Sequence, residues 1–117
     1  MKFKAPSLKD QFFRVYSKLR LIACDLDYYT QNNFKKEITV TSVYRNDKGV
    51  HGYWRGLDVR VEHARKMFFT KKEIKLILNY INEKYPYDPT RPRKETIIYH
   101  HVGLGPHHFH CQVCWER

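Results

Sequence analysis

Long apolar runs are missing from this sequence of 117 residues. No stretch approaches the roughly 20 apolar residues that a membrane-spanning helix needs, so the sequence predicts no transmembrane segment. The first six residues also lack the apolar segment of a secretory signal. We therefore expect synthesis in the cytoplasm without a signal peptide. The protein would reach a target outside the cytoplasm only after its release from the cell.

Cysteine is scarce, and its count is odd. Cys24, Cys111 and Cys114 cannot all pair, which excludes a disulfide framework and favours a reducing compartment. Cys111 and Cys114 have the spacing of half a zinc knuckle, but on an extended strand their sulfur atoms would lie on opposite faces. The sequence has no second such pair, so a four-thiolate site is excluded. A site built from His108, His110 and Cys114 stays an alternative.

Acidic residues are also few, with 12 Asp and Glu against 22 Lys and Arg, which gives a formal charge of +10 and a pI near 9.6. Such a field attracts polyanions, including nucleic acid, anionic lipid and the bacterial cell wall. The basic residues are spread along the chain without one long run, so a solubilising surface is an equal explanation. The length and the 42% of apolar residues predict one domain over residues 1–117.

Periodicity indicates which segments form helices and strands. Apolar residues at helical spacing predict a helix over residues 7–31, and a capping-box pattern at Thr70 and Glu73 predicts another over about 71–85. β-branched or alternating residues predict strands over residues 37–44, 56–61, 96–102 and 107–113. The last two are expected to pair around a loop at 103–106, and three prolines make 85–93 an irregular loop. We expect an α+β fold with a central antiparallel sheet flanked by helices.

Two segments far apart in the chain contain residue types that bind zinc. His51 and Asp58 lie among glycines, and His110 lies in a histidine-dense segment. A catalytic Zn²⁺ takes three nitrogen or oxygen ligands and keeps a fourth position open. On a strand, His108 shares a face with His110 while His107 points to the other face, so one imidazole can bind metal while its neighbour reaches the substrate. We expect a single zinc site in a groove.

The remaining histidines leave alternatives open. A one-residue slip of the last strand would exchange its faces and put His107 in the place of His108. His100 and His101 precede the hairpin loop, and we expect them to lie beside the site or in solvent instead of binding the metal. His63 is expected to be an ordinary surface residue.

The ordered set of these residues resembles a known enzyme group. Ser42-Val43-Tyr44-Arg45, His51, Gly56-Leu57-Asp58 and His108-Phe109-His110 are similar to the metallopeptidases that include lysostaphin-type enzymes, D-alanyl-D-alanine peptidases and the hedgehog signalling domain. The pattern is most similar to murein endopeptidases and phage-encoded cell-wall peptidases, and it spans residues from about 42 to 113. Positions 105–109 contain no acid, where many carboxypeptidases of the group carry a glutamate base. This difference favours the endopeptidase pattern.

The resemblance implies a role for each matching residue. His51, Asp58 and His110 would bind zinc, His108 would be the catalytic base, and Arg45 would stabilise the oxyanion. It also implies a zinc metallopeptidase that hydrolyses a stem-peptide or cross-link amide of bacterial peptidoglycan. We expect a monomeric lysin of a phage or prophage that acts on the cell wall after release, or a component carried in a virion.

Two other classes of function remain as alternatives. Aromatic residues such as Tyr28, Tyr53 and Trp54 could stack on bases in a metal-dependent nuclease or another nucleic-acid-binding protein. The basic residues form no patch interleaved with aromatics, however, so nucleic acid is not the expected partner. The third class is a zinc-binding module without catalysis, because a fold does not guarantee a reaction. The presence of His108 as a base argues for the enzyme.

Overall fold

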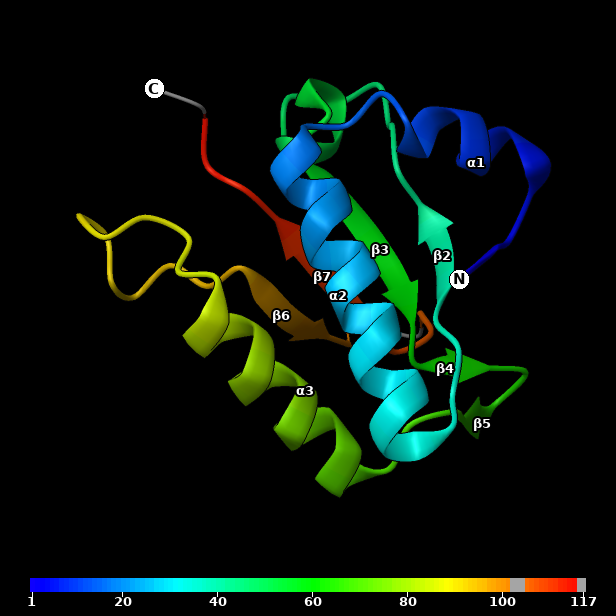
Figure 1. Cartoon of the computed structure of the whole chain (residues 1–117). Helices are drawn as coiled ribbons and strands as arrows, with labels where there is room; N and C mark the ends of the chain where they lie inside the picture. The colour runs from blue at the N-terminus through cyan, green and yellow to red at the C-terminus, as the bar shows by residue number, and fades with distance from the viewer. Residues whose placement is uncertain (102–104, 116–117) are drawn as a thin grey trace.

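The computed structural model describes residues 1–101 and 105–115 (Figure 1). The helices and strands of the described chain follow in the order β1 (Lys2–Phe3), α1 (Pro6–Phe12), α2 (Ser17–Phe34), β2 (Thr39–Ser42), the 3-10 helix η1 (Val50–Tyr53), β3 (Gly56–Arg60), β4 (Glu62–His63), β5 (Lys66–Met67), α3 (Lys71–Lys84), β6 (Ile97–His100) and β7 (His108–Gln112). The α+β class predicted from the sequence is therefore confirmed. Within the described residues, no helix combines the length and the apolar character that crossing a bilayer requires.

A five-stranded sheet has the order β1-β2-β3-β7-β6, and the predicted strands within it pair antiparallel to one another. β1 runs parallel to β2, with Lys2 opposite Thr39 and Phe3 opposite Val40. The sheet is therefore mixed, and the prediction of a purely antiparallel sheet was wrong at this edge. A two-residue strand has too little alternation to be recognised in a sequence.

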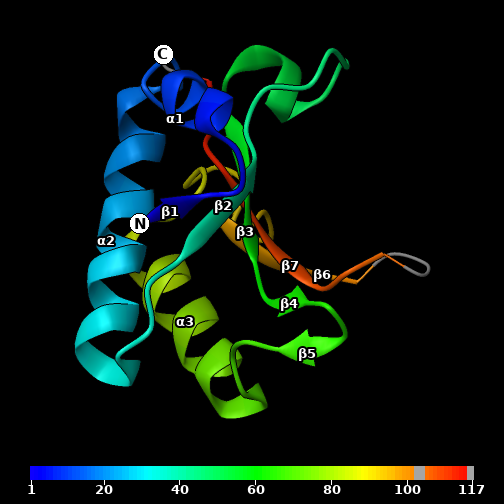
Figure 2. The ribbon, with the colours of Figure 1, turned by 90° about the vertical axis from the view of Figure 1, so that its right-hand side faces the viewer.

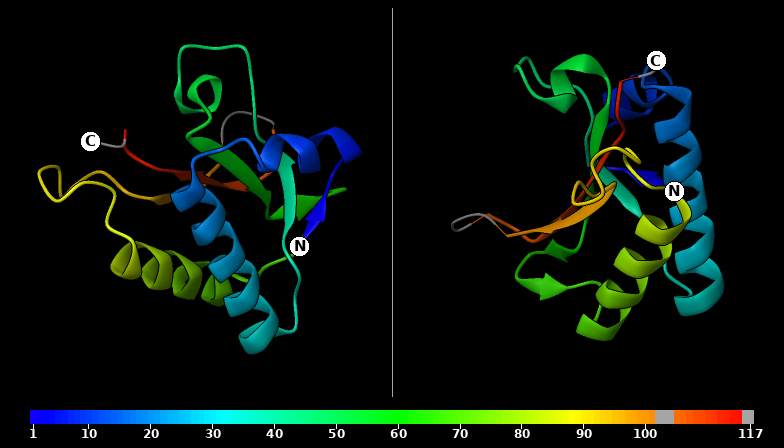
Figure 3. Two further views of the ribbon diagram at one scale, coloured as in Figure 1. Left: turned by 45° about the horizontal axis from the view of Figure 1, so that its top comes forward. Right: turned by 90° about the vertical axis from the view of Figure 1, so that its left-hand side faces the viewer.

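The helices α2 and α3 lie on one face of the sheet, and no α-helix of the described chain covers the other face (Figures 2 and 3). Strand residues that face the helices are fully buried, among them Val40, Leu57, Val59, Phe109 and Cys111. Because side chains alternate along a strand, their neighbours Thr41, Asp58, His108, His110 and Gln112 point to the uncovered face. The polar residues of β2, β3 and β7 thus share one surface.

The predicted helix over residues 7–31 is two helices, α1 and α2, separated at residues 13–16. The backbone of Tyr16 is extended, and its N–H donates to the carbonyl of Trp54 at 3.1 Å instead of to the preceding turn. Arg20 donates to the carbonyl of Val15 at 2.9 Å and satisfies another group at the break. Val15 is buried, so the apolar spacing continues across the break and conceals it.

The C-terminal prediction is largely confirmed. β6 and β7 are antiparallel, with His100 opposite His108, and Phe109, Cys111 and Val113 form the core side as expected. Residues 102–104, which include part of the predicted loop, lie outside the described residues. α3 begins with the predicted capping box, in which Thr70 and Glu73 exchange hydrogen bonds, and it ends at Lys84 before Pro86.

Candidate metal centre

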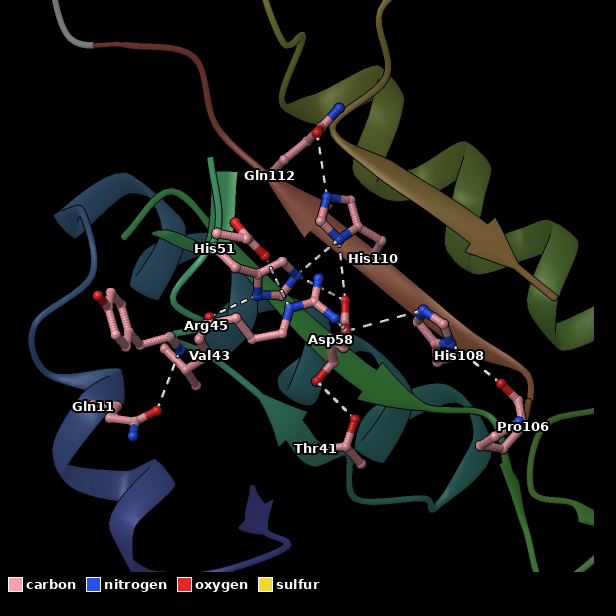
Figure 4. Close-up of polar contacts among 12 residues, drawn as sticks. Gln11, Thr41, Val43, Arg45, His51, Asp58, Pro106, His108, His110 and Gln112 are labelled. Atoms are coloured by element: carbon pink, nitrogen blue, oxygen red, sulfur yellow. Dashed lines mark hydrogen bonds and ion pairs between the residues drawn. The ribbon is translucent and has the colours of Figure 1, made fainter. Parts of the chain in front are cut away.

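Three sequence-predicted metal ligands meet on the uncovered face of the sheet (Figure 4). Asp58 on β3 lies directly opposite His110 on β7, and His51 approaches from η1. One ligand atom from each of the three residues lies within 4.8 Å of the other two. The chain thus brings together donors separated by up to 59 positions in the sequence.

The distances between the donor atoms match those of a tetrahedral metal site. Nδ1 of His110 lies 3.0 Å from Oδ1 of Asp58, and Nε2 of His51 lies 3.3 Å from that oxygen. The two ring nitrogens are themselves 3.3 Å apart. A tetrahedral zinc with bonds of 2.0–2.1 Å separates its ligands by about 3.4 Å. The three atoms therefore form one triangular face that such an ion can cap.

Two glycines allow the loop that carries His51 to approach β3. A Cβ on Gly56 would lie 2.6 Å from Cγ2 of Val50 and 3.3 Å from Cε1 of His110. A Cβ on Gly52 would lie 2.0 Å from the carbonyl oxygen of Asp47. Both positions lack the room for a side chain, which explains why glycines lie near His51 and Asp58 in the sequence.

The tautomer of His51 follows from its hydrogen bond. Nδ1 lies 2.6 Å from the carbonyl oxygen of Val43, and a carbonyl can only accept. Nδ1 must therefore carry the proton, which leaves the lone pair on Nε2 directed at Asp58. His51 is almost completely buried, with 2% of its surface exposed, so this ring has little freedom to turn.

The tautomer of His110 follows from a two-step chain through Gln112. Nε2 of Gln112 donates to the carbonyl of Glu95 at 2.8 Å, so the amide oxygen of Gln112 points the other way. That oxygen lies 3.3 Å from Nε2 of His110 and accepts its proton. The lone pair of His110 is then on Nδ1, the atom nearest Asp58. The sequence analysis missed Gln112, although alternation along the strand puts it on the same face as His110.

The resulting arrangement has three electron-pair donors around one point. In the tautomers fixed by Val43 and Gln112, the carboxylate of Asp58 faces the lone pairs of two imidazoles, and the three donors would repel one another without a shared cation. Where the two rings instead donate hydrogen bonds to Asp58, these bonds outweigh burial and hold its pKa well below the usual value. Two imidazoles and one carboxylate are a donor set of catalytic zinc sites. The residues present therefore fit a divalent metal.

His108 and Arg45 approach the second oxygen of the Asp58 carboxylate (Figure 4). Nε2 of His108 lies 4.0 Å from Oδ2 of Asp58, and Nη1 of Arg45 lies 3.9 Å from the same atom. Nδ1 of His108 donates to the carbonyl of Pro106 at 3.2 Å, so its lone pair is on Nε2. Arg45 also lies 3.5 Å from Asp47. Both predicted catalytic residues are thus next to the donor triangle and outside it.

His107 takes no part in the donor triangle, because β7 begins one residue later and has the unslipped register. Its ring contacts the hydroxyl of Tyr99 and stacks on His101, and its backbone N–H donates to Glu62 at 3.0 Å. The alternative in which His107 replaces His108 beside Asp58 is therefore not the arrangement observed.

His100 lies beside the centre, as expected. Its ring is nearly parallel to that of His110, with centroids 5.6 Å apart, and it meets the edge of His108 at 5.5 Å. Burial and the neighbouring His110 and His108 lower the pKa of His100. His100 is therefore a neutral wall of the centre. His63 is exposed on β4, again as expected.

The cysteines do not join this centre. Cys111 is fully buried in the core, whereas Sγ of Cys114 lies 3.3 Å from Nη2 of Arg91 and 3.8 Å from Asp88. The group of His51, Asp58 and His110 is the one that could hold a metal among the described residues. A site that combines Cys114 with the histidines is therefore not formed.

Comparisons of the chain with protein-family models, with curated proteins and with solved structures found no match. The geometry of the centre and the chemistry of its residues are therefore the basis for a functional proposal.

Proposed function

We propose that this protein is a zinc-dependent peptidase that hydrolyses an amide bond of bacterial peptidoglycan. The observation that carries the proposal is the convergence of two tautomer-fixed histidines and Asp58 within 3.3 Å of one another. A separate imidazole, His108, and a guanidinium, Arg45, stand on the far side of the same carboxylate. Such a division between metal ligands and groups that can transfer protons or stabilise charge is typical of hydrolytic metal centres.

Each residue has a definable task in this proposal. His51, Asp58 and His110 would hold the zinc, whose Lewis acidity activates water near neutral pH and polarises a carbonyl. Nε2 of His108 has a free lone pair and is half-exposed, so it can accept a proton from the nucleophile and return it to the leaving amine. The guanidinium of Arg45 can stabilise the negative charge that develops on the carbonyl oxygen.

The proposed substrate rests on the resemblance to murein endopeptidases and on charge. The net charge of +10 favours accumulation on an anionic cell wall. The centre lies on the face of the sheet opposite α2 and α3 (Figure 2), beside a groove lined by Asp58 and His108 in which an extended peptide could bind. We propose that the protein acts as a phage or prophage lysin, either after release onto the wall or from a virion.

Metal content tests the ligand assignment. Elemental analysis should find about one zinc per chain in the parent protein and in His108→Ala, and none in His110→Ala. His101→Ala is the control, because that ring stacks on His107 away from Asp58. Full zinc occupancy in His110→Ala would show that the ligand assignment is wrong.

Hydrolysis of purified murein tests the reaction. The parent protein should release new amino groups, lose this activity with a chelator and regain it with added zinc. His108→Ala should keep its zinc but lose activity by at least about 100-fold, within the range for a general base. A protein that binds zinc but cleaves DNA or RNA would support the nuclease alternative. Zinc binding without hydrolysis of either polymer would support the non-catalytic module.

A further inference from the structure

A groove of about 300 Å³ runs from the metal centre along the uncovered face of the sheet. It begins at Asp58 and His108, passes Thr41, and ends against the β4–β5 hairpin at His63 and Ala64. Figure 4 shows its inner end, where Thr41 and Pro106 flank Asp58 and His108. A ligand that enters this groove would therefore reach the donor triangle from one side.

Two cations line the groove without an acidic partner. Lys4 and Arg60 both contribute to its walls, and neither forms an ion pair with any residue that the structure describes. The two acids of the groove are already engaged: Asp58 by His110 and His51, and Glu62 by the backbone N–H of His107 at 3.0 Å. Lys4 and Arg60 are therefore available to bind an anion close to the centre.

The strand geometry sets the distance from this charge to the centre. Arg60 follows Asp58 by two residues on β3, so both side chains leave the same face about 7 Å apart. Lys4 follows Phe3, whose ring packs on Phe12 in the core, so Lys4 points to the open face. An extended peptide covers the same 7 Å with two residues. A group held at Arg60 would thus be about two residues from the reacting bond.

We propose that this groove binds a carboxylate of the substrate peptide through Arg60 and Lys4, which sets the position of the bond to be cleaved. The proposal rests on the peptidase function proposed above. The planar fork of a guanidinium matches a carboxylate with two parallel hydrogen bonds, and the ammonium of Lys4 adds charge. Nucleic acid fits this groove less well, because none of the described residues that line it is a Phe, Tyr or Trp on which a base could stack.

Binding of short probes tests the proposal without any catalysis. The probes are N-acetyl-alanyl-alanine, its C-terminal amide, and N-acetyl-glutamyl-alaninamide, which has a side-chain carboxylate. We expect at least one carboxylate probe to bind the His108→Ala protein about tenfold more tightly than the amide does. Binding is measured from the NMR shifts of the Arg60 Nε–H and of the amide groups of β3. Comparison of the two acids shows whether the bound carboxylate belongs to a peptide C-terminus or to a side chain.

Substitution at the groove completes the test. Arg60→Gln, with Lys4→Gln as a second variant, should reduce carboxylate binding to the level of the amide, while Arg93→Gln on an exposed loop should not. Equal binding of acid and amide, or undiminished binding in both variants, would overturn the proposal. So would Arg60-dependent binding of a thymidine hexanucleotide without binding of the acids.

The failure of this proposal can be told apart from failure of the peptidase function. If murein is hydrolysed but Arg60→Gln leaves KM and kcat unchanged, the carboxylate subsite is wrong and the peptidase stands. If murein is not hydrolysed but the acids bind in an Arg60-dependent way, the groove is a carboxylate site and the peptidase is wrong.

Discussion

The side-chain oxygen of Gln112 lies 3.3 Å from Nε2 of His110, while Nδ1 of the same ring lies 3.0 Å from Asp58. The amide of Gln112 is held in turn by the carbonyl of Glu95. These two hydrogen bonds in series direct a lone pair of His110 at the centre before any metal is bound. A similar hydrogen bond from His51 to the Val43 carbonyl does the same for the second imidazole.

Gln112→Leu should weaken zinc binding by about 10–100-fold, the usual cost of removing a partner that orients a metal ligand. The ring of His110 would keep its place on β7 but could adopt either tautomer. The measurement is a competition titration against a chromophoric zinc chelator. Asn79→Ala removes an exposed amide on α3 and should leave the dissociation constant unchanged. Equal zinc affinity in Gln112→Leu and the parent would show that the Gln112 contact does not orient His110.

Gly56→Ala should disturb the centre directly, because the added methyl group would lie between the helix that carries His51 and the ring of His110. The added Cβ would lie 2.6 Å from Val50, on the helix that carries His51, and 3.3 Å from His110. We expect a loss of stability of about 1–3 kcal/mol from overpacking, together with weaker zinc binding. Gly49→Ala is the matched control, because its Cβ would meet only Oδ1 of Asp47 at 3.4 Å. Urea unfolding and the zinc titration measure both effects, and equal results for the two variants would contradict this reading.

The shared face of Asp58 and His110 could be predicted from the sequence because it depends on strand alternation, whereas the approach of His51 was expected only from the family resemblance. His108 and His110 share a face on any extended strand, and Asp58 sits between two core residues, Leu57 and Val59, that fix its direction. What could not be predicted are contacts that depend on tertiary structure. The Val43 carbonyl that orients His51 has no side-chain signature, and the break before α2 depends on a hydrogen bond from Tyr16 to Trp54.

The short strands could not be predicted for a different reason. β1, β4 and β5 each have two residues, which is below the length at which alternation can be recognised. β1 nevertheless decides that the sheet is mixed, and β4 closes the end of the groove. The parts of the proposed site that depend on these strands therefore became visible only in the structure.

Asp25 should make stability depend on pH. Burial would raise its pKa, but hydrogen bonds from Lys84, Tyr85 and Tyr80 outweigh this and hold the pKa below the 3.8 of a free aspartate. Burial and the bond to Asp25 also raise the pKa of Tyr85 to about 12, so Tyr85 stays a donor. Because the folded pKa is the lower one, the stabilisation is complete above about pH 4 and is lost as the pH falls through the folded value.

Asp25→Asn should therefore lower the free energy of unfolding by about 1–2 kcal/mol at pH 7, since a charged acceptor shared by α2 and α3 is lost. The difference from the parent should shrink as the pH is lowered to about 2, where Asp25 is protonated in both states. Urea unfolding at a series of pH values measures this. Asp10→Asn on α1 should show no such trend, and a difference for Asp25→Asn that is constant with pH would rule out the linkage.

The β4–β5 hairpin should be stabilised by a better turn sequence. His63 pairs with Lys66, so Ala64 and Arg65 form a two-residue loop, and their φ angles are 51° and 65°. Positive φ at both positions suits Asn-Gly and costs other residues roughly 1 kcal/mol each. We expect Ala64→Asn with Arg65→Gly to raise the free energy of unfolding by about 1 kcal/mol.

Urea unfolding with an unchanged m value would measure this gain as a higher midpoint. Lys48→Gly removes the same charge from a loop position without positive φ, and it should be neutral or destabilising because glycine has more freedom when unfolded. If both variants raise stability equally, the gain comes from the lower net charge and not from the turn.

Because Ala64 also lines the groove, the double variant should keep its zinc while the outer end of the groove changes shape. An altered preference among the carboxylate probes with unaltered zinc affinity would then separate the groove from the metal centre.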